Sequence, residues 1–374
     1  MADTYRYAYL TIAATASNNS GEGCFRKVST GSIARPLRRT PGVVVRERRW
    51  PDLSAQMLPS YEILDYPLLQ RAWVYQERRM SPRMIHFTNS QLVWECQRFI
   101  QGEDGATINK EKSTAVCGDG KSASNIFDWQ TTVEEYSCLH LSFEEDRLPA
   151  ISAIVQAEMR IRKDDVYMAG MWKNMLLEDL LWCRPEGSPF IRRDYFRPER
   201  TSPSWSWSSV MGPVRFGKIG PSRLDGVRIT ETSYIAKGLP HMGDCSEASI
   251  KLKAPFTEAA FQHLRSDFVS MRELIAKRDS SYPPSKIIVC GNYADYNFLG
   301  FQNQYLDSQQ YAFVFVSLKG GQCSGLTLRR ISDTEYERIG LCVCYMESDG
   351  DASIQERDLR SYLDSLPVRE VKII

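Results

Sequence analysis

Neither sign of charge is in excess in this chain, and long apolar runs are missing. Its 374 residues include 47 Lys and Arg against 46 Asp and Glu, so the molecule as a whole sets up no field that would attract nucleic acid. The longest apolar run, residues 311–316, has the length of a buried strand, whereas a membrane-spanning helix needs about 18 apolar residues. We therefore expect no nucleic-acid partner and no membrane span.

Metal-binding patterns are missing as well. The ten cysteines include no Cys-x-x-Cys pair, and the four histidines, at positions 86, 140, 241 and 263, are far apart in sequence. Cys342 and Cys344 would share one face of a strand, but a zinc site would need two further ligands. We predict no metal site, and we interpret the thiols as buried small side chains of a protein in a reducing, cytoplasmic location.

Nucleotide-binding and hydrolase signatures are incomplete. The chain has no Gly-x-Gly-x-x-Gly, Gly-x-Ser-x-Gly or His-Glu-x-x-His motif. Residues 116–122 are similar to the end of a phosphate-binding loop, yet Ala115 stands where that loop needs glycine and no apolar strand precedes it. We interpret residues 101–126 as a flexible linker and predict no bound cofactor.

The first half of the chain contains several helical patterns and one hairpin pattern. Residues 5–16 predict a short helix leading into a buried strand, and residues 68–80 predict a helix. The segments 84–87 and 91–96 flank Asn89-Ser90, which is typical of a hairpin. Apolar residues at helical spacing predict two further helices, over 148–159 and 168–180.

Strand patterns dominate after residue 203. We predict strands at 204–210, 249–253, 286–290, 311–318, 325–331 and 338–346, with Gly320-Gly321 joining two of them, and one helix at 256–277. Residues 26–49 are rich in arginine, and we interpret them as an exposed basic loop. Contact of this loop with anionic lipid or nucleic acid is the alternative, although little aromatic sequence is interleaved with the arginines.

Three stretches, in this order, resemble the fungal proteins that carry the heterokaryon-incompatibility (HET) domain. The first is YRYAYLTIAA at 5–14, followed by Gly-Cys-Phe at 23–25. The second is RAWVYQERRMSPR at 71–83, which continues to Trp-Glu-Cys at 94–96, and the third includes PSWSWS at 203–208. The family positions are Arg71, Trp73, Gln76, Glu77, Ser81, Arg83, Trp94, Trp205 and Trp207.

The resemblance implies that residues 1–100 are the C-terminal part of a HET domain. Because family members carry two further strand motifs before the first match, we expect a truncated or degenerate member. HET domains resemble the α/β fold of Toll/interleukin-receptor (TIR) domains, full-length members trigger cell death after fusion of unlike cells, and some TIR relatives cleave NAD. A dinucleotide pocket would need the first strands of that sheet, since ligands bind at the carboxyl ends of parallel strands.

Glu77 is the best catalytic candidate in the sequence. It could act as a general base or bind a ribose, with its pKa tuned by Arg71, Arg78 or Arg79. In the structural alternative, which we favour, Trp73 anchors the helix in the core and Glu77 pairs with an arginine. Arg83 would then tie the end of the helix to the hairpin.

The Ser-Trp-Ser-Trp-Ser segment at 204–208 alternates as a half-buried strand does, which would put Trp205 and Trp207 on one face. An aromatic platform for a ligand is one interpretation. A packed aromatic core between sheet and helices is the other, and we favour it.

We predict an α+β fold with a partial α/β (TIR-like) HET segment. The expected parts are this segment at 1–100, a linker at 101–126, a helical connector at 127–200 and a mostly β region at 201–374. The first functional hypothesis is a protein that acts in nonself recognition through a protein partner, or through self-association at an unpaired sheet edge. The alternative is an enzyme on the same scaffold that uses Glu77, either an NAD hydrolase or a secondary-metabolite enzyme.

Overall fold

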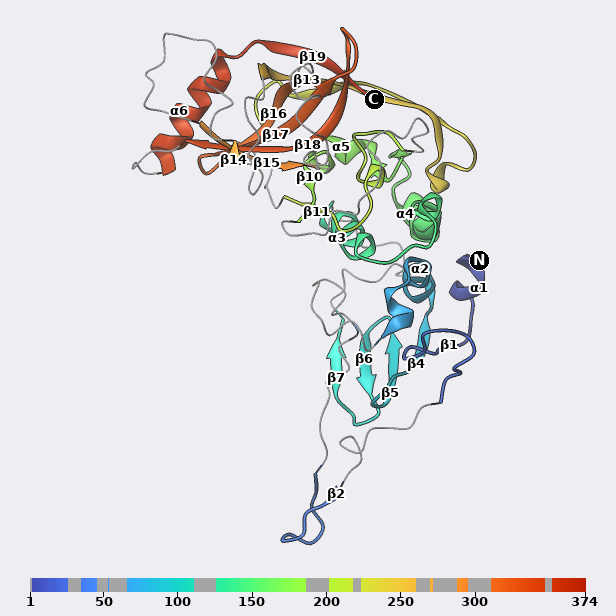
Figure 1. Cartoon of the computed structure of the whole chain (residues 1–374). Helices are drawn as coiled ribbons and strands as arrows, with labels where there is room; N and C mark the ends of the chain where they lie inside the picture. Colours follow the sequence, from blue (N-terminus) through green and yellow to red (C-terminus); the bar gives the residue numbers. More distant parts are fainter. Residues whose placement is uncertain are drawn as a thin grey trace, which may run out of the picture. The chain divides into compact units, whose positions relative to one another are not determined.

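The computed structural model describes residues 2–25, 35–45, 53, 66–110, 126–185, 202–217, 223–259, 270–271, 288–294, 311–346 and 352–374. These residues combine helices with β-sheets (Figure 1), which confirms the predicted mixture of α and β structure. The chain divides into two compact units, residues 1–164 and 165–374. The division falls inside the segment that we predicted as a helical connector.

The first unit is built on a five-stranded sheet in the order β1-β4-β5-β6-β7. Its strands are β1 (Thr11–Ala13), β4 (Arg83–Phe87), β5 (Leu92–Cys96), β6 (Phe99–Gly102) and β7 (Thr107–Asn109). The β4–β5 hairpin confirms the prediction. The linker predicted from residue 101 is wrong as far as Asn109, because Asp104 and Gly105 form a tight turn in which Asp104 Oδ1 accepts a hydrogen bond from the Ala106 amide at 2.9 Å.

Among the described residues of this unit, the helices are α1 (Ala2–Arg6), α2 (Ala72–Met80), α3 (Ile126–Ser137) and α4 (Ser152–Ile161). The predicted helix at 68–80 is broken at Arg71. Residues 67–70 form a 3-10 turn, Arg71 is extended, and the Ala72 amide bonds to the His140 carbonyl at 3.0 Å. The predicted helix at 148–159 is confirmed as a 3-10 turn at 149–151 that leads into α4.

The chain order β1, α2, β4 ends in a parallel strand pair, since β1 pairs with β4 in parallel. A parallel pair requires a crossover connection, which is commonly helical. Val74 of α2 shares one buried core with Leu53, Leu69, Val93 and Ile100. This helix therefore packs on the sheet face that carries Val93 and Ile100.

The same sheet face carries two polar residues. Met84 and His86 are the buried positions of β4, and Val93 and Glu95 are the buried positions of β5. Alternate residues of a strand share one face, so His86 and Glu95 point into the core beside their apolar neighbours.

Part of the predicted basic loop is ordered as a hairpin. Its strands are β2 (Arg35–Pro36) and β3 (Val44–Val45), which pair antiparallel. The loop prediction is therefore wrong for residues 35–36 and 44–45, which are strands. The predicted exposure is confirmed for each residue of 35–45 whose exposure is described, and the remainder of 26–49 lies outside the described residues.

The second unit begins with short pieces: β8 (Tyr167–Met168), β9 (Met171–Trp172), α5 (Leu176–Asp179), β10 (Trp182–Cys183) and β11 (Arg215–Phe216). The predicted helix at 168–180 is wrong for residues 168–172, whereas residues 173–175 form a 3-10 turn that leads into α5. Ala169 and Gly170 have φ of 46° and 91°, so the chain reverses between β8 and β9. The apolar residues of this segment are buried on all sides, and their helical spacing therefore did not mark one helix face.

The rest of this unit is a large sheet whose strands are β12 (Arg228–Ala236), β13 (Cys245–Ala259), β14 (Ser270–Met271), β15 (Ile288–Ala294), β16 (Tyr311–Lys319), β17 (Gln322–Arg330), β18 (Glu335–Met346) and β19 (Val368–Ile373). The strands predicted after residue 248 are confirmed. The helix predicted at 256–277 is wrong for residues 256–259, which belong to β13, and for residues 270–271, which form β14. The residues between them lie outside the described ranges.

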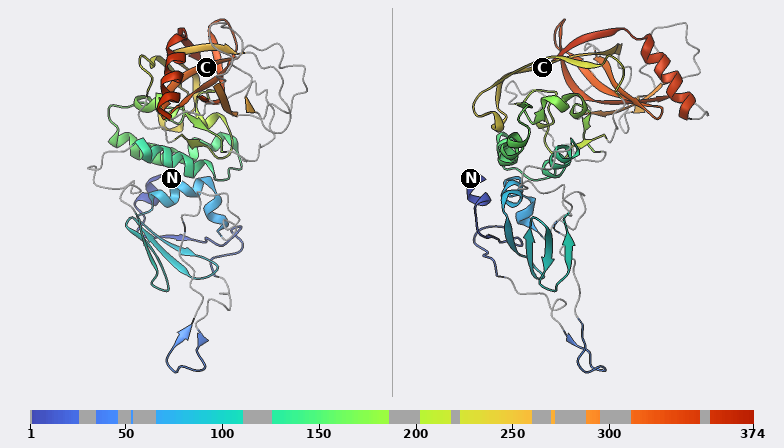
Figure 2. Two further views of the ribbon diagram at one scale, coloured as in Figure 1. Left: turned by 90° about the vertical axis from the view of Figure 1, so that its left-hand side faces the viewer. Right: turned by 180° about the vertical axis from the view of Figure 1, so that it is seen from behind.

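Five of these strands close a ring of backbone pairing. β13 pairs with β16, β16 with β17, β17 with β18, β18 with β19, and β19 again with β13. The strands curl around a common interior (Figure 1, Figure 2). Helix α6 (Ala352–Ser365) packs on β16, β17 and β18. Within the described ranges, no helix is long and apolar enough to cross a membrane.

Candidate functional site

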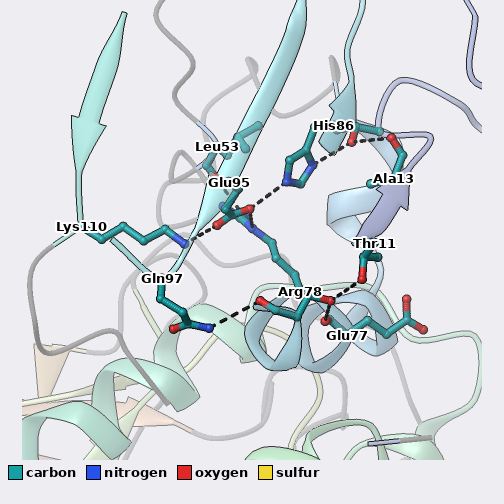
Figure 3. Close-up of polar contacts among 11 residues, drawn as sticks. Thr11, Ala13, Leu53, Glu77, Arg78, His86, Glu95, Gln97 and Lys110 are labelled. Carbon is teal, nitrogen blue, oxygen red and sulfur yellow. Dashed lines mark hydrogen bonds and ion pairs between the residues drawn. The ribbon is translucent and has the colours of Figure 1, made fainter. Parts of the chain in front are cut away.

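Glu95 lies at the centre of a polar cluster in the first unit (Figure 3). Its Oε2 atom accepts hydrogen bonds from Arg78 Nε at 2.7 Å and from His86 Nε2 at 2.8 Å. Its Oε1 atom accepts from Lys110 Nζ at 2.6 Å. Helix α2, strands β4 and β5 and the end of β7 thus converge on one carboxylate.

Burial sets the electrostatics of this cluster. The side chains of Glu95 and Arg78 are 7% and 12% exposed, and that of His86 is fully buried. Burial alone would raise the pKa of Glu95, but the charge of Arg78, the hydrogen bond from His86 and the charge of Lys110 hold it well below its usual range. Burial is also the largest cause that lowers the pKa of His86, so this imidazole is neutral at pH 7.

The cluster continues from His86 to Thr15, whose Oγ1 atom lies 2.9 Å from His86 Nδ1. Because the neutral imidazole donates from Nε2 to Glu95, its Nδ1 atom accepts the Thr15 hydroxyl proton. Hydroxyl, imidazole and carboxylate in this order are the parts of a nucleophilic triad. However, Thr15 and His86 are both 0% exposed, so no substrate reaches the hydroxyl, and the chain of hydrogen bonds serves to hold the fold.

Residues that follow α2 hold the β1 segment in place. Ser81 Oγ lies 2.8 Å from Thr11 Oγ1, and Arg83 Nη1 donates to the Tyr9 carbonyl at 2.9 Å. The Arg83 guanidinium also lies over the Tyr9 ring, 5.0 Å from its centroid. Together with the Thr15 bond of His86, these contacts fix residues 9–15 against the start of β4.

Two other motif residues connect α2 to the helices of the first unit. Trp73 Nε1 donates to Asp146 Oδ2 at 3.0 Å. Gln76 is 4% exposed, and its Oε1 atom accepts a hydrogen bond from the Ala153 amide at the start of α4, at 3.0 Å. Trp73 and Gln76 therefore act as packing and capping groups.

Glu77, the predicted catalytic residue, lies apart from the Glu95 cluster. Its carboxylate points away from Glu95 (Figure 3) and accepts a hydrogen bond from the Tyr5 hydroxyl. Burial raises the pKa of Glu77, and the Tyr5 bond and the Arg71 charge oppose that rise. Burial, together with the Glu77 charge, raises the pKa of Tyr5 to about 12. Glu77 thus joins α1 to α2 through the hydrogen bond from Tyr5. The predicted partner arginine contributes through the charge of Arg71.

The Ser-Trp-Ser-Trp-Ser segment, in the second unit, is not the predicted strand. Residues 204–206 form a turn, and residues 207–209 form a 3-10 helix whose N-cap is Ser206. Trp205 and Trp207 are both 0% exposed, so neither offers a platform to a ligand. Trp207 Nε1 donates to the Gly170 carbonyl at 2.7 Å, and Ser206 Oγ donates to the Ala169 carbonyl. The motif thereby fixes the left-handed turn between β8 and β9.

Arg338 completes this core and is also 0% exposed. Its guanidinium carbon lies 3.5 Å from the centroid of the Trp182 ring, and its Nη2 atom donates to the Trp182 carbonyl at 2.6 Å. The Arg338 amide donates to Ser204 Oγ at 3.0 Å. The stacked arginine thus links β18, β10 and the tryptophan motif.

The structure brings Ser81 and Arg83 to the β1 segment and Glu77 to α1, but it does not gather the motif residues into one pocket. Trp94 lies on the sheet face opposite to that of Glu95, since neighbouring strand residues alternate. The sequence interpretation missed the polar cluster around Glu95. We call this cluster, formed by Arg78, His86, Glu95 and Lys110, the hub. Its signal was a titratable residue at an inward position of each hairpin strand: His86, two places from Met84, and Glu95, two places from Val93.

Among the residues that the structure describes, no group of three His, Cys, Asp or Glu side chains is placed to bind a metal ion. Comparison of the chain with protein-family models, curated protein sequences and solved structures finds no match in any of the three. The resemblance to HET proteins therefore stays a prediction.

Proposed function

We propose that this chain is a HET-domain-like protein related to fungal nonself recognition and cell death, and that it acts in the cytoplasm by binding another protein. We also propose that its first hundred residues are the C-terminal part of a TIR-like sheet. The parallel pair of β1 and β4, with α2 between them in the chain, supports this assignment.

The observation that carries the proposal is the edge of the sheet at β1. β1 is the end strand of the sheet, with one paired neighbour among the described residues. Tyr7, Tyr9 and Ile12 beside it are 76%, 84% and 63% exposed. An unpaired strand edge next to large apolar side chains is a template for strand addition by a partner.

The roles of the motif residues support binding over chemistry. Ser81, Arg83 and His86 hold the β1 segment. Trp73 and Gln76 hold helix α2, which directly precedes Ser81 and Arg83 in the chain. A motif used in this way presents an edge rigidly. Rigid presentation lowers the entropy cost of association.

An enzyme that uses Glu77, as an NAD hydrolase or on another small molecule, is the second candidate. It is favoured by one observation: burial raises the pKa of this partly exposed carboxyl, which lies beside a tyrosine hydroxyl. Such a shift suits a general acid or base. The two candidates make opposite predictions for substitutions at Glu77 and at the β1 edge.

The test is inducible expression of the full chain in a filamentous fungus, with cell viability as the readout. Three proteins are compared at equal abundance: the wild type, a Tyr9→Ser/Ile12→Asp edge variant and a Glu77→Gln variant. We expect the wild type and Glu77→Gln to reduce viability and the edge variant to lose the effect. Loss with Glu77→Gln alone would replace the proposal with the enzyme, and a harmless wild type would contradict the role in cell death.

A further inference from the structure

The hairpin formed by β2 and β3 exposes side chains that its own fold does not use. Arg35 pairs with Val45 and Pro36 with Val44, and the Leu37 amide bonds to the Val43 carbonyl at 2.8 Å. Every residue from 35 to 45 whose exposure is described is exposed. A two-stranded hairpin is at best marginally stable by itself in water, so an external surface that binds these side chains would also stabilise their arrangement.

The hairpin is locally cationic although the whole chain is nearly neutral. Residues 35–45 contain three arginines and no aspartate or glutamate, whereas the net charge of the full chain is +1. Arg38 and Arg39 lie at the tip, between the two strands, and both are exposed. The described residues provide no carboxylate partner for either of them. The tip therefore attracts anionic surfaces.

Aliphatic side chains accompany these charges. Leu37, Val43 and Val45 are 42%, 43% and 52% exposed. Residues opposite each other in a ladder share a face, as do alternate residues of one strand. The Leu37–Val43 pair and Val45 therefore lie on one face, together with Arg35, which is opposite Val45. The arginines at the tip border this face.

The combination of exposed arginines with exposed aliphatic side chains favours one kind of anionic surface over another. Single-stranded nucleic acid is bound through aromatic rings that stack on bases, and residues 35–45 contain no aromatic residue. Exposed Leu and Val side chains gain nothing from a phosphate backbone. A bilayer with anionic headgroups takes both kinds of group, because its phosphates and carboxylates pair with arginine while its acyl boundary accepts aliphatic side chains.

We propose that the hairpin at 35–45 is a peripheral docking site for anionic lipid bilayers. Leu37 and Val43 enter the boundary between headgroups and acyl chains, and Arg38 and Arg39 pair with the headgroups. The cytoplasmic leaflet, which carries the anionic lipids of the cell, is the surface that fits this chemistry. Docking of this kind requires no membrane-spanning helix.

The experiment is co-sedimentation of the full chain with vesicles of phosphatidylcholine, with and without phosphatidylserine. We expect binding that depends on phosphatidylserine and weakens in high salt. Each basic residue near an anionic membrane contributes roughly 5-fold in affinity, so Arg38→Gln/Arg39→Gln should weaken binding roughly 25-fold. Leu37→Ser/Val43→Ser should weaken it as well, and neither double variant should shift the unfolding temperature, because the residues are exposed.

Matched controls remove the same groups from the second unit. Arg215→Gln/Arg228→Gln loses two exposed arginines, and Ile235→Ser/Ile331→Ser loses two exposed aliphatic side chains. Both should bind vesicles as the wild type does. Equal losses in control and hairpin variants would overturn the proposal. So would binding to single-stranded RNA that depends on the arginines but not on Leu37 and Val43, with no vesicle binding.

Discussion

At the scale of the residue, the first unit depends on one carboxylate. Glu95 receives hydrogen bonds from Arg78, His86 and Lys110 at 2.6–2.8 Å, in a site that is almost closed to water. A buried charge pair adds little net stability relative to an apolar replacement, but loss of one partner leaves the others buried and uncompensated. Glu95 is therefore a single point at which the first unit is vulnerable.

Replacement of Glu95 by glutamine should destabilise the first unit by about 3–5 kcal/mol, because Arg78 and Lys110 lose their shared counter-charge. The measurement is urea unfolding followed by tryptophan fluorescence. Glu77→Gln is the matched control, since it removes the same charge from a partly exposed neighbouring position, and it should cost less than about 1 kcal/mol. Equal losses in the two variants would contradict the central role of Glu95 in the stability of the first unit.

The buried imidazole predicts how stability depends on pH. Because burial lowers the folded-state pKa of His86 below 6.5, the unfolded chain binds the proton more readily. The contribution of the neutral His86 imidazole to folding stability is complete above pH 6.5. It is lost as the pH falls from there through the folded-state pKa of His86. In urea unfolding at a series of pH values from neutral downward, His86→Gln should show a smaller fall in stability than the wild type. A variant with an unchanged slope would contradict a buried, neutral His86.

Sequence reasoning found the residues around the hub but not the hub itself. It singled out Glu77, which lies in the most specific motif, and did not consider Glu95 as a candidate, because a sequence pattern leaves the environment of a carboxyl open. Which carboxyl is buried and paired depends on the hairpin register that places Glu95 opposite Met84 and on the approach of Lys110, the residue after β7. Neither contact is encoded by local spacing.

At the scale of the element, regular strands were predictable and compact turns were not. Strand β16 contains the longest apolar run of the chain, and β17 and β18 carry shorter apolar stretches that turn residues separate from their neighbours, so the sequence pattern defines all three. The helix predicted at 168–172 and the strand predicted at 204–208 are wrong for the opposite reason. Both segments are short and buried, and their apolar spacing fits several elements equally well. Their structure is decided by tertiary hydrogen bonds such as the one from Trp207 to the Gly170 carbonyl.

Close packing of β16 on β17 gives a test of the strand ring. A Cβ atom on Gly325 would lie 2.1 Å from the Val314 carbonyl oxygen and 2.9 Å from Phe315 Cα, so the backbone would have to move. Gly325→Ala should destabilise the second unit by about 3 kcal/mol. Gly238→Ala, where an added Cβ meets open space, is the control and should change stability by less than about 0.5 kcal/mol. Both are read out by the thermal unfolding transition of the full chain, and a tolerated Gly325→Ala would contradict the register of β16 and β17.

The hold of Ser81 on the β1 segment is testable by hydrogen–deuterium exchange. Ser81→Ala removes the hydroxyl that lies 2.8 Å from Thr11 Oγ1 and should cost roughly 1 kcal/mol. Amides of residues 11–16 should then exchange faster, while those of β5 and β6 keep their protection. Ser90→Ala, at the turn between β4 and β5, should leave residues 11–16 unchanged. Uniform loss of protection in the Ser81 variant would indicate general destabilisation rather than release of one edge.

At the scale of the whole molecule, each of the two units has a buried core, and some large apolar side chains remain exposed to solvent. The first core is organised around Glu95, and the second is organised around Trp182, Trp207 and Arg338. The large apolar groups left on the surface include Tyr7, Tyr9 and Ile12 at the β1 edge. Burial of such groups away from water is favourable, so the proposed partner at that edge would account for their exposure.

Photocrosslinking at position 9 in living cells tests this account most directly. Tyr9 is replaced by the photoreactive residue p-benzoylphenylalanine, which conserves an aromatic ring, and the same residue at the exposed Phe143 of the first unit is the control. We predict one discrete covalent protein adduct from position 9, lost when Ile12→Asp is added, and no adduct from position 143. Cells that lose viability on expression of the chain but yield no adduct from position 9 would contradict an interaction role for the β1 edge.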